Sequence, residues 1–171
     1  MSGSRLLGVV DRQFRNIQPP ERWPEELTGQ TDEWMEMATD LVFPTLADVL
    51  SIHEDIVAED PESEPGVRSP EAVQSALTYV SVGYFGEVPA TIHEKAAHLM
   101  RLLVAEHPFV DGNKRTALNT VVVFYEVNGY EFEYGDASIR KLLRRFATDV
   151  DAVEMDEIVA YCREHTERAK E

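Results

Sequence analysis

Hydrophobic positions recur at helical spacing from residue 45 onward, and hydroxyl, proline and glycine residues punctuate them. Thr45 is followed three residues later by Asp48, which is the pattern of a capping box at the start of a helix. The apolar residues after it fall on one helical face, and Pro61 marks the end of this predicted helix. Ser69 and Pro70 have the residue types of a cap and a first helical position, so a second helix is expected there.

The same signals continue downstream. Thr91 and Glu94 form a second capping box, and the helix that they open should end before Pro108, because a residue that precedes proline avoids the helical region. Three more helices are predicted, at residues 116–127, about 137–147 and about 153–168. No alternating strand pattern accompanies them, so the predicted fold class is mainly α.

Residues 1–44 have a different character from the rest. They contain both tryptophans, Trp23 and Trp34, together with the Pro19-Pro20 pair and scattered acids. A short strand near residues 6–10 and a helix near residues 31–41 are the only elements expected there. We therefore divide the chain into an N-terminal extension, residues 1–44, and a domain, residues 45–171. The extension is either a stabilising addition or a lid that acts on its own chain.

Composition indicates a globular protein of the cytoplasm. Hydrophobic residues make up 43% of the chain and charged residues 28%, which is ordinary for a folded domain. Cys162 is the single cysteine, so no intrachain disulfide or cysteine metal cluster is expected. The N-terminus has no apolar run long enough for a signal peptide, and no segment is long enough to span a bilayer.

The charge is strongly negative. The chain carries 32 acidic and 16 basic residues, for a net charge of −16. This balance excludes a generic nucleic-acid binder and argues against docking on an anionic membrane. Only 4 of the bases are lysine, a composition typical of a halophilic cytoplasm, although an ordinary acidic cytosolic protein is the alternative. Residues 114–145 depart from this trend, with 6 bases against 4 acids.

One segment between two predicted helices, residues 107–115, combines residue types that handle phosphate. Gly112 and the free amides of the helix that follows form an anion cradle, to which Arg115 adds a fork of donors and Asn113 a neutral donor. Asp111 is a hard oxygen ligand for Mg²⁺, and His107 has the chemistry of a general base near neutral pH. A capped helix start with a solvated charge cluster is the structural alternative. Phe109 is expected to anchor the loop in the core.

Other residues are discounted or stay open. His93 and His98 are five positions apart, so their rings point to different helix faces and do not form a zinc motif. His53 is interpreted as a surface or packing histidine, and Cys162 as a small buried residue. A basic face is predicted at Arg140, Lys141, Arg144 and Arg145, which is either a solvated face paired with local acids or a docking patch for an acidic partner or nucleotide phosphates.

The segment HPFVDGNKRTAL resembles the signature of the Fic/Doc superfamily, whose loop runs His-x-Phe-x-Asp/Glu-Gly-Asn-x-Arg. The run that begins at Lys114 is similar to the Doc (death-on-curing) branch, and the resemblance covers residues 45–168. It implies a Fic/Doc-like helical bundle with a short, β-hairpin-like flap over the active-site loop. It also implies that the flap, Pro65, Gly66, Val67 and Arg68, aligns the backbone of a target protein as an added strand.

The resemblance also implies roles at the loop: His107 as the catalytic base, Asp111 as the metal ligand, and Gly112, Asn113, Lys114 and Arg115 around the ATP phosphates. Two positions separate this chain from relatives that transfer AMP, because it has Lys114 where they have a small residue and Leu118 where they have a second arginine. The Doc branch shares both departures and resembles a kinase that passes the γ-phosphoryl group of Mg²⁺-ATP to elongation factor Tu.

The expected function is therefore a Doc-like, toxin-type protein kinase acting on a Ser or Thr hydroxyl of an elongation factor-like target. AMP transfer is the alternative of the same class, and a non-catalytic nucleotide- or partner-binding module is the alternative of another class. The resemblance further implies an antitoxin whose disordered tail folds into the active-site groove. No internal inhibitory motif of the Ser/Thr-x-x-x-Glu-Gly/Asn type is present in the sequence.

Overall fold

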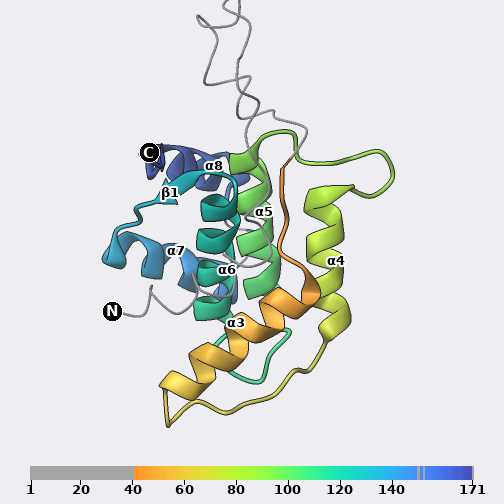
Figure 1. Cartoon of the computed structure of the whole chain (residues 1–171), viewed down its shortest axis with the longest axis vertical. Helices are drawn as coiled ribbons and strands as arrows, with labels where there is room; N and C mark the ends of the chain where they lie inside the picture. Colours follow the sequence, from red (N-terminus) through yellow and green to blue (C-terminus); the bar gives the residue numbers. More distant parts are fainter. Residues whose placement is uncertain (1–40, 150, 152, 171) are drawn as a thin grey trace, which may run out of the picture.

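Six helices and one pair of short strands form the described part of the protein, which comprises residues 41–149, 151 and 153–170 of a computed structural model (Figure 1). The mainly α fold class is confirmed. The strand expected near residues 6–10 and nearly all of the helix expected near residues 31–41 lie outside the described residues. The division at residue 44 stays a prediction.

The first two described helices begin where the capping pattern predicts. Helix α3 spans Leu46–Glu59, and Thr45 and Asp48 exchange the two side-chain-to-amide hydrogen bonds of a capping box. Helix α4 spans Pro70–Ser81, with the Ser69 hydroxyl accepting a hydrogen bond from an amide of its first turn. These caps satisfy amides that a helix start leaves without partners, and the cap at Ser69 also fixes the end of the α3–α4 connection that leads into α4.

Helices α5 and α6 form the centre of the molecule. Helix α5 spans Ile92–Ala105 and buries nine of its residues, and it packs against α4, α6, α7 and α8. The capping box at Thr91 is confirmed. Helix α6 spans Asn113–Val127, starting three residues earlier than predicted, and Gly129 follows it with the left-handed φ of +84°. The loop between α5 and α6 therefore rests on the two best-packed helices.

The C-terminal part differs from the prediction in one respect. Helix α7 spans Asp136–Thr148 as expected, but α8 spans only Met155–Glu164. The prediction of a helix to residue 168 is wrong, because Thr166–Arg168 form strand β2, which pairs antiparallel with β1, Tyr130–Phe132. Strands of three residues are too short to show an alternating pattern, and each is stabilised by a partner distant in the sequence.

A short arm ahead of α3 ties the first described residues to the core. The Asn128 side chain accepts a hydrogen bond from the Val42 amide and donates one to the Val42 carbonyl, both at 2.8 Å. The Phe43 ring stacks on Phe124, and the buried Lys95 ammonium lies 5.7 Å from the Phe43 ring centre. In the described part of the chain, no helix is long and apolar enough to cross a membrane.

Candidate active site

The loop between α5 and α6 lies at the same end of the molecule as the α3–α4 connection, toward the bottom of Figure 1. Gly112 caps α6 with a φ of +75°, a conformation that glycine adopts without penalty. Phe109 is fully buried, which confirms its expected role as the anchor of the loop. The loop is therefore fixed at its middle by a core side chain and at its end by the first turn of α6.

Asn113 clamps this loop through both polar atoms of its side chain. Its Oδ1 accepts a hydrogen bond from the Phe109 amide at 2.9 Å, and its Nδ2 donates to the Phe109 carbonyl at 3.0 Å. One of the two N–H groups of the side chain that was expected to donate to a phosphate is therefore bonded to the loop backbone. Asn113 also has a backbone amide in the first turn of α6 that can bind an anion.

The predicted flap lies alongside this loop. Val67 and Phe109 form an antiparallel bridge, in which the amide of Val110 donates to the Gly66 carbonyl at 3.0 Å and the amide of Arg68 donates to the Pro108 carbonyl at 2.8 Å. The flap is a single extended segment paired with the loop, rather than a hairpin of its own. Val67 and Arg68 are exposed, so the outer edge of this segment faces solvent.

Gly66 makes the close approach of flap and loop possible. Its φ of +142° is a conformation that residues with a Cβ rarely adopt. A Cβ at this position would lie 2.8 Å from the Cγ2 of Val110, well inside normal van der Waals contact. Glycine is therefore required here both by its backbone conformation and by the packing of the loop.

Asp111 is held as a carboxylate. The Gly112 amide donates to its Oδ1 at 2.6 Å, and this hydrogen bond is the main cause that lowers the pKa of Asp111 below its ordinary value. Desolvation opposes this shift as the second-largest effect, and smaller effects of the Glu64 amide, the Ser63 hydroxyl and the positive charge of Arg115 lower the pKa further. The expected metal ligand is thus surrounded by donors from both the flap side and α6.

Arg115 is already engaged by the α3–α4 connection. Its Nη1 lies 3.2 Å from the Asp60 carboxylate, and its Nη2 donates to the Ser63 hydroxyl at 2.6 Å. Hydrogen bonds from the Glu62 amide and the Ser63 hydroxyl, followed by the Arg115 charge, lower the pKa of Asp60. Asp60 and Ser63 were not among the predicted site residues, because only the folded chain brings them to Arg115.

His107 stands at the start of the loop in a strained backbone conformation. Its φ is +44°, which is uncommon for a residue with a Cβ, and such outliers concentrate at functional sites. Its side chain is exposed, as is that of Lys114. Leu118, one turn further along α6, packs against the core instead. The candidate base and the extra cation are thus accessible, while the position of a second arginine is taken by an apolar side chain.

His53 is the site residue that the sequence interpretation missed. It is 2% exposed on α3, its ring is stacked on Phe109, and its Nε2 lies 2.9 Å from the Asp111 carbonyl. The packing interpretation is confirmed, but the loop contact was not foreseen. The available signal was its place between Ile52 and Ile56 on the buried face of α3, where a polar side chain needs a partner.

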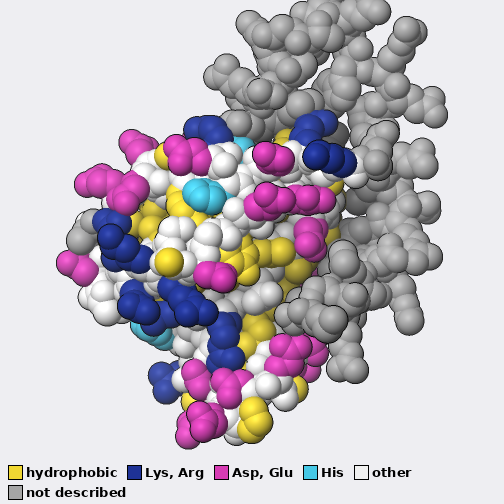
Figure 2. All heavy atoms as spheres, turned by 90° about the vertical axis from the view of Figure 1, so that its left-hand side faces the viewer, with side chains coloured by type: hydrophobic (Ala, Val, Ile, Leu, Met, Phe, Trp, Pro, Cys, Tyr) yellow, Lys and Arg dark blue, Asp and Glu magenta, His cyan; other side chains and the backbone are white. Residues whose placement is uncertain are grey.

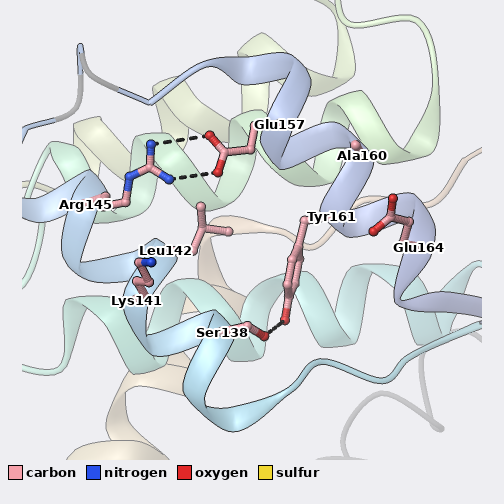
Figure 3. A pocket seen from close by; sticks show the side chains of 8 residues that line it. All are labelled: Ser138, Lys141, Leu142, Arg145, Glu157, Ala160, Tyr161 and Glu164. Carbon is pink, nitrogen blue, oxygen red and sulfur yellow. Dashed lines mark hydrogen bonds and ion pairs between the residues drawn. The ribbon is translucent and has the colours of Figure 1, made fainter.

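The predicted basic face lies on α7, away from the loop. Figure 2 shows Lys and Arg side chains gathered on the side of the molecule that carries α7. Arg145 forms a two-fold contact with Glu157 of α8, at 2.8 Å and 3.3 Å (Figure 3), which agrees with pairing to local acids at that residue. Arg140, Lys141 and Arg144 are exposed.

A cavity of about 370 Å³ lies between α7 and α8. Lys141 and Arg145 line it opposite Glu157, and Tyr161 bonds to Ser138 across its floor (Figure 3). None of its lining residues comes from the α5–α6 loop or the flap. Its mixed charges lack the convergent donors of the loop, so we do not assign the reaction to this cavity.

The discounted residues are in structural positions. His93 is buried and bonded to the Tyr125 hydroxyl, and no group of three metal-binding side chains is found among the described residues. Cys162 is fully buried, and burial raises the pKa of its thiol to about 12. A buried thiol that stays protonated is not a nucleophile.

A comparison with protein families finds one match in the part of the chain that carries this site. The Fic/DOC family model matches residues 43–125. The matched residues run from the arm ahead of α3 to near the end of α6 and include both the loop and the flap. No curated protein matches the chain.

Proposed function

Residues 43–125 match the Fic/DOC family, whose domain is typical of AMP- and phosphoryl-transferring enzymes, and from this match we propose that the protein is an ATP-dependent protein kinase. The proposed reaction transfers the γ-phosphoryl group of ATP to a serine or threonine hydroxyl of a target protein. The observation that carries the proposal is the placement of an exposed, strained His107 beside an anion cradle that Phe109 and Asn113 hold in place.

His107 acts as the general base in this proposal. Its imidazole takes the proton of the acceptor hydroxyl as that oxygen bonds to the γ-phosphorus, and the bond to the bridging oxygen breaks to release ADP. The amides of the first turn of α6 and the Arg115 guanidinium stabilise the negative charge of the phosphates. Most of the rate then comes from positioning and charge neutralisation, which a fixed loop supplies.

Asp111 suits the magnesium ion that this chemistry requires. Its low pKa keeps it ionised, and a single carboxylate fits Mg²⁺, which retains most of its waters and takes its other ligands from substrate phosphates. When bound, Mg²⁺ neutralises phosphate charge. The Gly112 amide, which donates to Oδ1 of Asp111 at 2.6 Å, holds the carboxylate in place.

Lys114 and Leu118 favour γ-phosphoryl over AMP transfer. Lys114 places a long exposed cation on the first turn of α6, where a small residue would leave room for the phosphates. Leu118 packs against the core, so no cation stands one turn along α6 to bind the outer phosphates of an AMP donor. AMP transfer remains the alternative, because the same base and cradle serve attack on the α-phosphorus.

The flap supports a protein substrate rather than a small molecule. It pairs with the loop through one edge, and the exposed Val67 and Arg68 leave its other edge open for the backbone of a target to add as a strand. An elongation factor of translation is the first target to test, on the resemblance to the Doc branch. An antitoxin tail that fills the groove is the proposed means of control.

Labelled ATP tests the reaction directly. The protein is incubated with a lysate of its host and ATP labelled at the α or the γ phosphorus, beside His107→Ala, and His165→Ala serves as a histidine control outside the site. Label from the γ position that requires His107 supports the kinase. Transfer from the α position alone contradicts it and supports AMP transfer. ATP binding with no transfer from either position supports a binding module.

The acidic composition leads to a second proposal, about the salt concentration at which the protein is active. We expect transfer to tolerate or require molar salt, because ions screen the self-repulsion of a chain with a net charge of −16. Measuring transfer and the melting temperature from low salt to molar KCl tests it. Activity confined to low salt contradicts a salt-adapted protein.

A further inference from the structure

His53 makes two contacts with the loop from helix α3. Its ring lies parallel to Phe109, with the ring centres 3.9 Å apart and the planes 9° apart. Its Nε2 donates to the carbonyl of Asp111 over 2.9 Å. At 2% exposed, this side chain is sealed beneath the loop. It therefore holds two loop residues without access to the reacting atoms.

With these contacts, side chains from two helices hold the loop. Asn113 of α6 fixes the backbone of Phe109, whereas His53 of α3 fixes the ring of Phe109 and the backbone of Asp111. Gly112 lies close to the imidazole ring of His53, because a Cβ added at Gly112 would be 3.9 Å from the Cδ2 of His53. The peptide that joins Asp111 to the cradle thus rests on this imidazole.

We propose that His53 is a positioning residue for the reaction: its Nε2–H sets the Asp111 peptide, and through it the carboxylate and the first amides of α6, in the geometry that holds Mg²⁺-ATP. This inference rests on the proposed function. A buried histidine with one side-chain hydrogen bond to a loop carbonyl acts as the outer partners of metal ligands do, by orienting the groups that bind.

The expected loss is in binding Mg²⁺-ATP. His53→Phe keeps an aromatic ring against Phe109 and removes the donor, so we expect the affinity for Mg²⁺-ATP to fall about 10–100-fold, the range observed when outer-sphere partners of a metal site are removed. His53→Gln restores a donor at nearly the same reach and should recover most of the affinity. KM for Mg²⁺-ATP should rise more than kcat falls.

His165 offers a matched control within the same chain. It also stacks on an aromatic ring, Tyr161, at 3.9 Å and 18°, and its Nδ1 donates to a backbone carbonyl at 2.8 Å. Its contacts lie at the end of α8, outside the loop. His165→Phe therefore removes the same kind of hydrogen bond and should leave Mg²⁺-ATP affinity unchanged.

Calorimetric titration of Mg²⁺-ATP into the full-length variants, with the melting temperature of each, tests the proposal. Weak binding by a folded His53→Phe, recovery in His53→Gln and no change in His165→Phe support it. The proposal is overturned if folded His53→Phe binds as well as the wild type, if His53→Gln is as weak as His53→Phe, or if the wild type does not bind Mg²⁺-ATP.

Binding is measured without an acceptor, so this result is separate from the fate of the kinase proposal. A wild type that binds Mg²⁺-ATP but labels no protein would contradict the kinase while the His53 comparison stands. If His53→Phe fails to fold, amide hydrogen exchange of His53→Gln replaces it. Wild-type protection at Val110 and Gly112 together with wild-type affinity then supports the proposal, and faster exchange with unchanged affinity overturns it.

Discussion

The two loops at the ends of α5 are built from similar residues and have opposite properties. Each contains a phenylalanine, a glycine with a φ of more than +70° and a non-glycine residue with positive φ, namely Phe85 before α5 and His107 after it. In the first loop Phe85 is fully exposed, and a local bridge joins Tyr84 to Glu87. In the second, Phe109 is fully buried and is held by groups from α3, α6 and the flap.

The difference shows that tertiary contacts, and not loop composition, make the second loop a fixed site. The positive φ at Phe85 belongs to a tight turn whose phenylalanine side chain is fully exposed. The positive φ at His107 is maintained beside residues that two helices hold, so the strain lies at the residue that we propose as the base. Substitutions at equivalent positions in the two loops therefore distinguish effects on the stability of a turn from effects on binding and transfer at the site.

Removing the two phenylalanines should produce the largest contrast. Phe109→Ala leaves a cavity in the core, and we expect it to lower the free energy of unfolding by about 3–5 kcal/mol. Phe85→Ala should change it by no more than about 0.5 kcal/mol, because an exposed side chain loses little on truncation. Denaturant unfolding of both variants measures the difference, and equal losses would show that the two loops are held alike.

The asparagine clamp should have the next largest effect. Asn113→Ala leaves the amide and carbonyl of Phe109 without their partner, at about 1–3 kcal/mol for a buried polar group. Asn119→Ala is the control, since the side-chain amide of Asn119 in the same helix donates to the Arg115 carbonyl one turn earlier. Mg²⁺-ATP binding should weaken in the first variant alone. Intact binding in a folded Asn113→Ala would contradict the clamp.

Glycine substitutions test the approach of the flap. Gly66→Ala and Gly86→Ala both force a Cβ onto a backbone with positive φ, but only the first also meets a neighbour, Val110 at 2.8 Å. Gly66→Ala should therefore cost about 1 kcal/mol more than Gly86→Ala. It should also slow transfer to the target by displacing the flap. Equal melting temperatures and equal rates would show that the bridge is dispensable.

Replacing the two residues that have positive φ by glycine should not destabilise the protein, whereas most substitutions do. His107→Gly and Phe85→Gly each relieve a positive φ, so each variant should be as stable as the wild type or more stable by up to about 1 kcal/mol. Only His107→Gly should abolish transfer. A large loss of stability in His107→Gly would mean that the histidine side chain supports the fold.

The smallest effect on stability is expected at Asp60. Asp60→Asn removes the partner of Arg115, and because both side chains are well exposed the melting temperature should change little. The pKa of Asp60 is lowered by the Glu62 amide, the Ser63 hydroxyl and Arg115, so any stabilisation is present at neutral pH and is lost as the pH falls through that lowered pKa. Wild type and variant should converge in acid, and a difference that grows there would contradict the pair.

Much of this fold followed from local signals, and much of the site did not. The capping boxes at Thr45 and Thr91 were predictable because each depends on a neighbour three residues away, and Phe109 could be expected in the core as an aromatic side chain in a polar loop. The β1–β2 pair and the Arg115–Asp60 contact were not, since their partners lie far apart in the sequence. His53 had the right pattern for burial, but only the folded chain identifies the loop as its partner.

The central claim is that this fixed loop passes the γ-phosphoryl group of ATP to a protein hydroxyl. Its most direct measurement is the mass spectrum of the modified acceptor, taken after incubation with Mg²⁺-ATP and either the wild-type enzyme or His107→Ala. The account predicts a serine or threonine that gains one phosphoryl group with the wild type and nothing with His107→Ala. An acceptor that gains an adenylyl group, or one that is phosphorylated equally by His107→Ala, would contradict it.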